Sequence, residues 1–375
     1  FGKEALFENV NIKFAPGNCY GLIGANGAGK STFLKVLSGD LEPTSGSVHI
    51  KKGQRIAVLK QNHFEFDDYT AIDTVIMGHK HLYDVMKEKD ALYMKPDFND
   101  EDGIRVAHLE TEFAEMDGWE AESNAATLLN GLGIDTVLHY KQMSELNGSE
   151  KVKVLLAKAL FGNPDILLLD EPTNYLDAEH IEWLKRYLQE YENAFILISH
   201  DIPFLNDVVN IIYHMENQEL NRYVGDYDHF QEVYEVKKAQ LEAAYRRQQQ
   251  EISELKDFVA RNKARVSTRN MAMSRQKKLD KMDVIELAAE KPKPEFHFKY
   301  GRTPGKYIFE TKDLVIGYNE PLSRPVTLSM ERGNKIALVG ANGIGKTTLL
   351  KSILGLIPSL KGSCAVSYTH LTLPT

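Results

Sequence analysis

The sequence predicts an α/β fold built on a parallel sheet and joined to a long helical segment. Residues 19–39 and 335–355 each combine an apolar strand pattern, a glycine-rich loop and a helix pattern. The apolar runs 166–169 and 195–198 are continuous, which is typical of strands covered on both faces. Neither Pro nor Gly interrupts residues 226–291, which favours helix throughout that segment.

The two glycine-rich loops fit the phosphate-binding pattern G-x-x-x-x-G-K-[ST] in its strand–loop–helix context. Glycines let successive N–H groups turn toward phosphate oxygens, and the helix N-terminus adds its positive end. A solitary glycine-rich turn with a surface lysine is the alternative, but it would not explain the repetition. We predict two ATP sites, the first formed by Gly24, Asn26, Gly27, Gly29, Lys30, Ser31 and Thr32, and the second by Gly340, Asn342, Gly343, Gly345, Lys346, Thr347 and Thr348.

Polar residues at the ends of the two continuous strands complete the first predicted site. Asp170 can hold Mg²⁺ through water, and Glu171 is placed to polarise the attacking water. His200 follows the second strand and is expected to contact the γ-phosphate rather than to be structural. Solvated acids and a structural histidine are the alternatives. The predicted catalytic residues are Glu171, His200 and Gln61, and the predicted Mg²⁺ ligands are Ser31, Gln61, Asp170 and Thr347.

The composition limits the class of protein. No apolar run reaches 18 residues, so no membrane-spanning helix is expected, and the first residues do not read as a secretion signal. Only Cys19 and Cys364 occur, which suits a reducing, cytoplasmic environment. His79 and His81 have no accompanying ligands, so we expect no metal centre there.

The helical segment predicts an antiparallel hairpin with its turn near residues 262–270. Apolar positions repeat at alternating spacings of four and three, as in a heptad seam. The first seam comprises Leu241, Tyr245, Gln248, Ile252, Leu255 and Val259, and the second Leu279, Met282, Ile285 and Ala289. The sequence 291–296, with its two prolines, ends the pattern and begins a linker.

The predicted turn carries a dense positive charge on an acidic chain. The formal net charge is −8, yet residues 261–281 hold eight basic side chains against one acidic one. A solvated helix face is the alternative, but the positive charge is nearly unopposed, so i,i+4 pairing cannot absorb it. A polyanion such as RNA would release counterions on meeting it. The predicted RNA contacts are Arg261, Lys263, Arg265, Arg269, Arg275, Lys277 and Lys278.

Taken with the sequences LNGSE at 146–150 and DILLLDEPTNYLD at 165–177, these motifs resemble the ABC-F family of ATP-binding cassette proteins. The resemblance implies a P-loop NTPase cassette with a helical subdomain, an α-helical hairpin linker and a partial second cassette. It also implies that Asn147, Gly148 and Ser149 form the signature that caps the nucleotide of the other cassette. Asn147 and Ser149 depart from the usual Ser and Gly. The resemblance places Phe1 and Tyr318 against adenine rings.

The resemblance further implies an ATPase that acts on ribosomes. ATP and Mg²⁺ would clamp the two cassettes of the intact protein together, and the hairpin would then contact tRNA and rRNA. Hydrolysis to ADP and phosphate would reopen the clamp. A nucleotide-binding subunit of a membrane transporter and a DNA-handling ATPase are the alternatives, and ribosome protection against antibiotics would be a special case.

The expected domains are a first cassette at 1–230, with a helical subdomain at about 65–150, a hairpin at 231–292 and part of a second cassette at 293–365. Residues 366–375 are interpreted as a translated sequencing adapter, because they do not continue the preceding pattern. No second signature or catalytic glutamate follows the second phosphate loop. We therefore expect the chain to be a truncated piece that hydrolyses little ATP unless first cassettes pair between chains.

Overall fold

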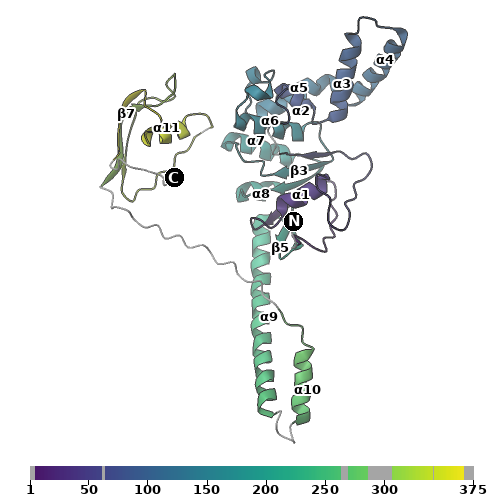
Figure 1. Ribbon diagram of the computed structural model, residues 1–375, viewed down its shortest axis with the longest axis vertical. Coiled ribbons are helices and arrows are strands. Elements are labelled where there is room, and N and C mark those ends of the chain that lie inside the picture. The colour runs from purple at the N-terminus through teal and green to yellow at the C-terminus, as the bar shows by residue number, and fades with distance from the viewer. Residues whose placement is uncertain (1–4, 61–63, 263–268, 286–305, 341, 367–375) are drawn as a thin grey trace. The chain divides into compact units, whose positions relative to one another are not determined.

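The structure is a computed structural model that describes residues 5–60, 64–262, 269–285, 306–340 and 342–366. It divides into two compact units (Figure 1). The first contains Phe1–Tyr175 and Glu179–Glu290, and the second contains Leu176–Ala178 and Lys291–Thr375. Among the described residues, no helix is both long enough and apolar enough to cross a membrane.

A six-stranded sheet in the order β2-β3-β4-β1-β5-β6 forms the centre of the first unit. The first five strands of this order run parallel, and only β6 runs antiparallel to its neighbour β5. This arrangement confirms the predicted α/β fold. The strands are β1 (Cys19–Gly24), β2 (Ile56–Val58), β3 (Ile166–Asp170), β4 (Ala194–Ile198), β5 (Ile211–Glu216) and β6 (Glu219–Val224).

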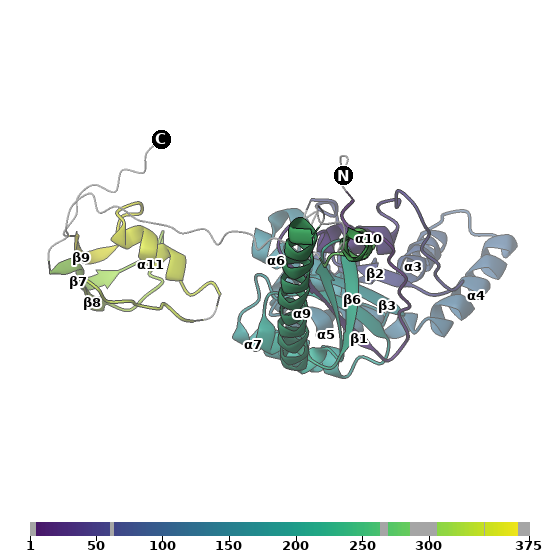
Figure 2. The same ribbon diagram turned by 90° about the horizontal axis from the view of Figure 1, so that it is seen from below.

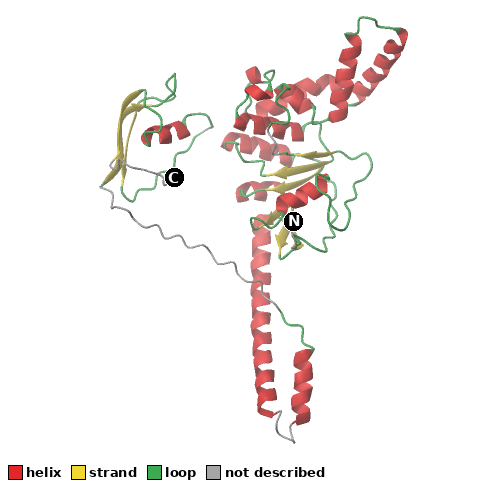
Figure 3. Cartoon of the chain, in the orientation of Figure 1, coloured by secondary structure: helices red, strands yellow, loops and turns green. Residues whose placement is uncertain are grey.

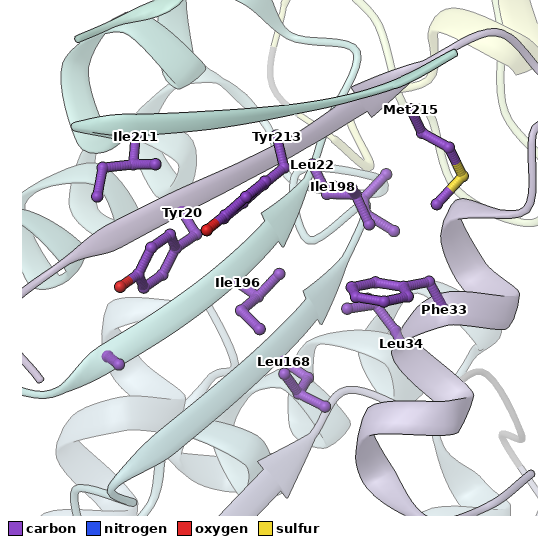
Figure 4. Packing of buried hydrophobic residues seen from close by; sticks show 11 residues of the cluster. Tyr20, Leu22, Phe33, Leu34, Leu168, Ile196, Ile198, Ile211, Tyr213 and Met215 are labelled. Carbon is purple, nitrogen blue, oxygen red and sulfur yellow. The ribbon is translucent and has the colours of Figure 1, made fainter. Parts of the chain in front are cut away.

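Helix α1 (Lys30–Ser38) covers one face of this sheet. Its Phe33 and Leu34 lie against Leu168, Ile196 and Ile198, and all five side chains are buried (Figure 4). Burying a side chain of this size stabilises the fold by about 1.5–3 kcal/mol. The packing therefore fixes the start of α1 at the carboxyl edge of the sheet.

Alternate strand residues, including Leu167, Leu169, Phe195 and Leu197, point to the opposite face and are also buried. This accounts for the continuous apolar runs in the sequence. The helices that follow or precede these strands are α6 (Gly148–Leu160), α7 (Ala178–Gln189) and α8 (Ile202–Val208).

The region predicted as a helical subdomain contains four α-helices: α2 (Ala71–Ile76), α3 (Lys80–Tyr93), α4 (Asp100–Glu115) and α5 (Ala121–Gly131). Short 3-10 turns lie at Gly118–Glu120, Thr136–Leu138 and Met143–Glu145. Asn99 begins α4 with a capping box in which it and Asp102 exchange hydrogen bonds. Helices α3 and α4 lie side by side (Figures 1 and 3).

The predicted hairpin consists of α9 (Tyr227–Asn262) and α10 (Arg269–Asp280), which lie side by side (Figures 1 and 2). Ile252, Leu255 and Val259 of the first seam are buried, but Leu241 is 48% exposed, because α10 ends before reaching it. The predicted second helical seam is therefore wrong at Met282 and Ile285, which lie beyond the end of α10, while Ala289 lies outside the described residues.

Residues beyond α10 are held by a side chain of α9 instead of by helical packing. Gln248 donates to the carbonyl oxygen of Asp283 at 2.7 Å and accepts from the N–H of Ile285 at 2.7 Å. These two bonds satisfy backbone groups that a continuing helix would have paired internally.

The second unit contains an antiparallel sheet in the order β8-β7-β9, with α11 (Lys346–Ile353). Its strands are β7 (Tyr307–Val315), β8 (Val326–Glu331) and β9 (Lys361–Val366). The strand predicted before the second phosphate loop, at 335–340, is absent, and Val339 there is 86% exposed. The reason is that no described strand lies beside this segment to accept and donate its backbone hydrogen bonds.

Candidate nucleotide-binding site

The first phosphate loop leaves the centre of the sheet. Gly24 ends β1 beside Met215 of β5, with φ 155°, and a Cβ there would lie 2.5 Å from the Met215 carbonyl oxygen. Gly29 precedes α1 in a left-handed conformation and provides no side-chain cap for it. The first N–H groups of α1 are therefore available to an anion.

Lys30 folds back over the loop that it follows. Its Nζ donates to the carbonyl oxygens of Gly24 at 2.7 Å and Ala25 at 3.1 Å, and the residue is buried. Burial lowers the pKa of Lys30, while the nearby charges of Glu171 and Asp170 act in the opposite direction. The lysine is thus held in the loop, close to the carboxylates of β3.

Glu171 and His200 meet because β3 and β4 are adjacent parallel strands with Asp170 opposite Ile198. The N–H of Glu171 donates to the Ile198 carbonyl oxygen at 2.9 Å, and Glu171 has a left-handed φ of 52°. The N–H of His200 donates to Glu171 Oε2 at 3.3 Å, and His200 Nε2 lies 3.4 Å from Glu171 Oε1. The pairing of β3 with β4 therefore holds Glu171 and His200 next to each other.

The environment of Glu171 suits a general base. Its side chain is 18% exposed, and Oε1 has no hydrogen-bond partner among the described residues. Burial raises the pKa of Glu171, partly offset by His200. A carboxylate with a raised pKa accepts a proton from water more readily than an exposed one.

These groups surround one cavity of about 340 Å³. The predicted residues that line it are Asn26, Gly27, Gly29, Lys30, Ser31, Thr32, Asp170, Glu171 and His200. The N–H groups of the loop, the Lys30 ammonium and the Ser31 and Thr32 hydroxyls are groups that can bind a triphosphate. The Ser31 hydroxyl and the Asp170 carboxylate are the hard oxygen ligands that Mg²⁺ prefers. No group of three or more His, Cys, Asp or Glu that could hold a metal occurs among the described residues. Mg²⁺ would therefore depend on phosphate oxygens for part of its coordination.

Sequence reasoning missed Leu6, which also lines this cavity. The Leu6 Cβ would lie 3.3 Å from a Cβ built on Gly29, so Leu6 packs directly against the phosphate loop. An isolated apolar residue near the start of the chain gives no signal for this. Phe1 and Gln61, predicted for the same site, lie outside the described residues.

The second phosphate loop repeats the local geometry of the first. Lys346 Nζ donates to the Gly340 carbonyl oxygen at 2.6 Å, and Gly343 and Gly345 have positive φ values, as Gly27 and Gly29 do. Thr347 and Asn342 are exposed, Thr348 is buried, and Tyr318 is 62% exposed. The described residues of the loop therefore keep the local geometry of the first loop without the strand that was predicted before them.

The predicted signature residues lie at the start of α6. Asn147 Oδ1 accepts from the Glu150 N–H at 3.0 Å, and Glu150 Oε2 accepts from the Asn147 N–H at 2.9 Å, which forms a capping box. Ser149 Oγ lies 3.4 Å from the Tyr175 carbonyl oxygen. Asn147, Gly148 and Ser149 do not line the first cavity. The helix start that they form has the positive dipole end that an anion would contact.

The basic side chains of the hairpin are less uniform than their sequence suggests. Arg261 and Lys277 are exposed, and the Arg275 guanidinium lies 3.6 Å from the centre of the Phe258 ring. Lys278 Nζ contacts Glu251 Oε1 at 2.5 Å, so the expectation of unopposed charge is wrong for it. Antiparallel packing brings Glu251 beside Lys278, which sequence spacing cannot reveal.

The remaining predicted RNA contacts are placed only in part. Arg269 is the first residue of α10, whereas Lys263 and Arg265 lie outside the described residues.

Comparison with known proteins identifies the family of this chain. A family model described as ABC transporter matches residues 7–174 and 323–373, and a second with the same description matches 213–298. The chain is 60% identical over 369 residues to the uncharacterized ABC transporter ATP-binding protein YfmM of Bacillus subtilis, covering 97% of the chain and 71% of the relative. It is 51% identical to YkpA of the same organism, covering 97% of the chain and 68% of that relative. It is 44% identical to the probable ATP-binding protein YbiT of Escherichia coli O157:H7, and the match covers 95% of the chain and 67% of that relative. The chain therefore belongs to the ABC transporter family of ATP-binding proteins.

Proposed function

We propose that this protein is a ribosome-binding translation factor of the ABC-F type, driven by ATP binding and hydrolysis. ATP with Mg²⁺ would clamp two cassettes together, and the clamped form would hold the basic hairpin against tRNA and rRNA. The observation that carries this proposal is the exposed positive charge of a hairpin that belongs to the same compact unit as the nucleotide cavity.

In the proposed reaction, the Glu171 carboxylate accepts a proton from the water that attacks the terminal phosphorus, while the bond from that phosphorus to ADP breaks. His200, 3.4 Å from Glu171, would orient the water and the terminal phosphate. Lys30 and the loop N–H groups would stabilise charge on the phosphate oxygens. Mg²⁺, when bound, neutralises phosphate charge, and Ser31 and Asp170 would hold it.

The proposed role of the hairpin is electrostatic. Arg261 and Lys277 present exposed cations that would release counterions on contact with a phosphate backbone. Arg275 is stacked on Phe258 and so keeps its guanidinium oriented. Lys278 would contribute less, since Glu251 already neutralises it.

A transporter subunit is the second candidate, because two relatives carry the words ABC transporter in their names. Co-sedimentation separates the two. The proposed function predicts that the protein pellets with ribosomes in the presence of ATP, and the alternative predicts that it pellets with membranes.

Two variants, one single and one double, test the proposed function. Glu171→Gln should lower the ATP hydrolysis rate by about 10²–10⁴-fold, as loss of a general base does, and should retain the protein on ribosomes. Arg261→Gln with Lys277→Gln should weaken ribosome binding and reduce the slope of log affinity against log salt by about 2. Lys51→Gln with Lys52→Gln removes the same exposed charge from the cassette and should leave the slope unchanged. Equal slopes for the two double variants would exclude the hairpin as the RNA contact.

A further inference from the structure

A second cavity, of about 300 Å³, adjoins the nucleotide cavity. Lys30 and His200 line both cavities, so they form the wall between them. Tyr227, Phe230 and Tyr234, in the first turns of α9, also line the second cavity. The base of the basic hairpin is therefore only one cavity away from the residues expected to contact the γ-phosphate.

The base of α9 is fastened to the sheet beside this cavity. The ring of His214, on β5, lies 5.2 Å from that of Phe230 and 5.0 Å from that of Tyr234, centre to centre. The Tyr234 hydroxyl donates to Glu216 Oε1 at 2.8 Å. His214 Nδ1 is buried and has no hydrogen-bond partner among the described residues, with Glu216 Oε2 at 3.8 Å.

This polar atom and the open volume beside it contrast with a close-packed interior, in which buried polar groups are paired. The base of α9 therefore packs its aromatic rings against His214 of β5, and it also borders the open cavity that His200 lines. A shift of the base of α9 toward this open volume would meet fewer packed side chains than a shift within a filled interior.

Helix α8 joins the two walls of the cavity directly. It begins two residues after His200, where Asp201 Oδ1 accepts from the Phe204 N–H at 3.1 Å. Near its other end, Asn206 Oδ1 accepts from the Asp228 N–H, in the first turn of α9, at 3.0 Å. One short helix thus carries His200 at its start and holds the start of α9 at its end.

We propose that α8 transmits nucleotide binding from His200 to the hairpin, with Asn206 as the positioning residue at the α8–α9 contact. This rests on the proposed function, because it supplies the route by which ATP would aim the hairpin. The geometry gives leverage: α9 has 36 residues and is about 54 Å long. A rotation of about 5° at its base would therefore move its far end by roughly 5 Å.

Hydrogen exchange with and without the ATP analogue AMP-PNP and Mg²⁺ tests this on the whole chain, without ribosomes. In the unsubstituted protein, the analogue should slow amide exchange of residues 24–32. It should also slow exchange of residues 227–234 by about fivefold, because strengthening one helix-cap hydrogen bond is worth about 1 kcal/mol. Asn206→Ala should keep the first effect and lose the second.

Two variants make the result specific. Asn206→Asp retains an oxygen acceptor at the start of α9 and should restore the effect at 227–234. Asp207→Ala is the matched control, since Asp207 lies on the same helix but pairs with Lys185, 3.2 Å away. It should behave as the unsubstituted protein.

The proposal is overturned if Asn206→Ala retains slowed exchange at 227–234, or if the Asp207 and Asn206 variants lose it equally. Absence of any effect at residues 24–32 in the unsubstituted protein would instead overturn the proposed nucleotide site, and the transmission route with it.

Discussion

Substitution of Gly24 by alanine tests whether the phosphate loop is constrained by the sheet behind it. Gly24 pairs with Met215 across β1 and β5, and its φ of 155° is one that side chains rarely adopt. A Cβ would lie 2.5 Å from the Met215 carbonyl oxygen, whereas real Cβ contacts essentially never fall below 3.0 Å. The backbone of one strand must therefore move by at least about 0.5 Å, at the centre of a close-packed sheet.

The expected cost has two parts. Forced overpacking costs about 1–3 kcal/mol, and an unfavourable φ adds about 1–2 kcal/mol, so Gly24→Ala should destabilise the protein by roughly 2–5 kcal/mol. Gly27→Ala is the matched control in the same loop: its φ is 80°, but nothing lies within 4 Å of its Cβ position. It should therefore cost only about 1–2 kcal/mol.

Urea unfolding of both variants, followed by circular dichroism and by tyrosine fluorescence, measures the difference. We expect the Gly24 variant to be less stable than the Gly27 variant by about 1–3 kcal/mol. Binding of a fluorescent ATP analogue should weaken in the Gly27 variant although it is the more stable of the two variants, because the added methyl group enters the phosphate cavity that Gly27 lines. Equal stability of the two variants would refute the argument that Met215 restricts residue 24.

Two further predictions concern other parts of the first unit. Burial lowers the pKa of Lys158 to about 8, although its Nζ lies 3.5 Å from the centre of the Phe66 ring. Between about pH 8 and pH 10, Lys158 is therefore neutral in the folded protein but still protonated in the unfolded chain. The free energy of unfolding should rise with pH over this range, because the unfolded state binds one more proton than the folded state. Lys158→Met should remove this rise in urea unfolding measured across that range, and an unchanged pH profile would contradict the assignment. Gln248→Ala should free the segment 281–285 by removing two hydrogen bonds of about 1 kcal/mol each, detected as faster proteolysis there. Gln250→Ala, which removes only a contact within α9, should not accelerate that cleavage.

Much of the nucleotide site could be predicted because it is encoded in consecutive residues. The phosphate loop, Lys30 and the first turn of α1 form one local unit, and the same pattern gives similar φ values at Gly340, Gly343 and Gly345 even without a paired strand. The carboxyl ends of β3 and β4 were also predictable, because parallel strands bring such ends to one edge of a sheet.

Pairings between distant segments could not be predicted. The hairpin pattern indicated two helices, but it did not show that Gln248 would pair with residues 283 and 285, beyond the end of α10 at Asp280. The opposition of Lys278 by Glu251 depends on which turns of α9 and α10 face one another. Neither is expressed in the local sequence.

The sequence by itself determined the chemistry available to this protein: a phosphate loop, a carboxylate, a histidine and a concentrated positive charge. Only the tertiary structure decided that Glu171 is half-buried beside His200 and that α8 connects His200 to the base of the hairpin. The physical reason is that loop conformation and helix starts follow from neighbouring residues, whereas burial and contact follow from strand order and helix register, which residues far apart in the chain fix together.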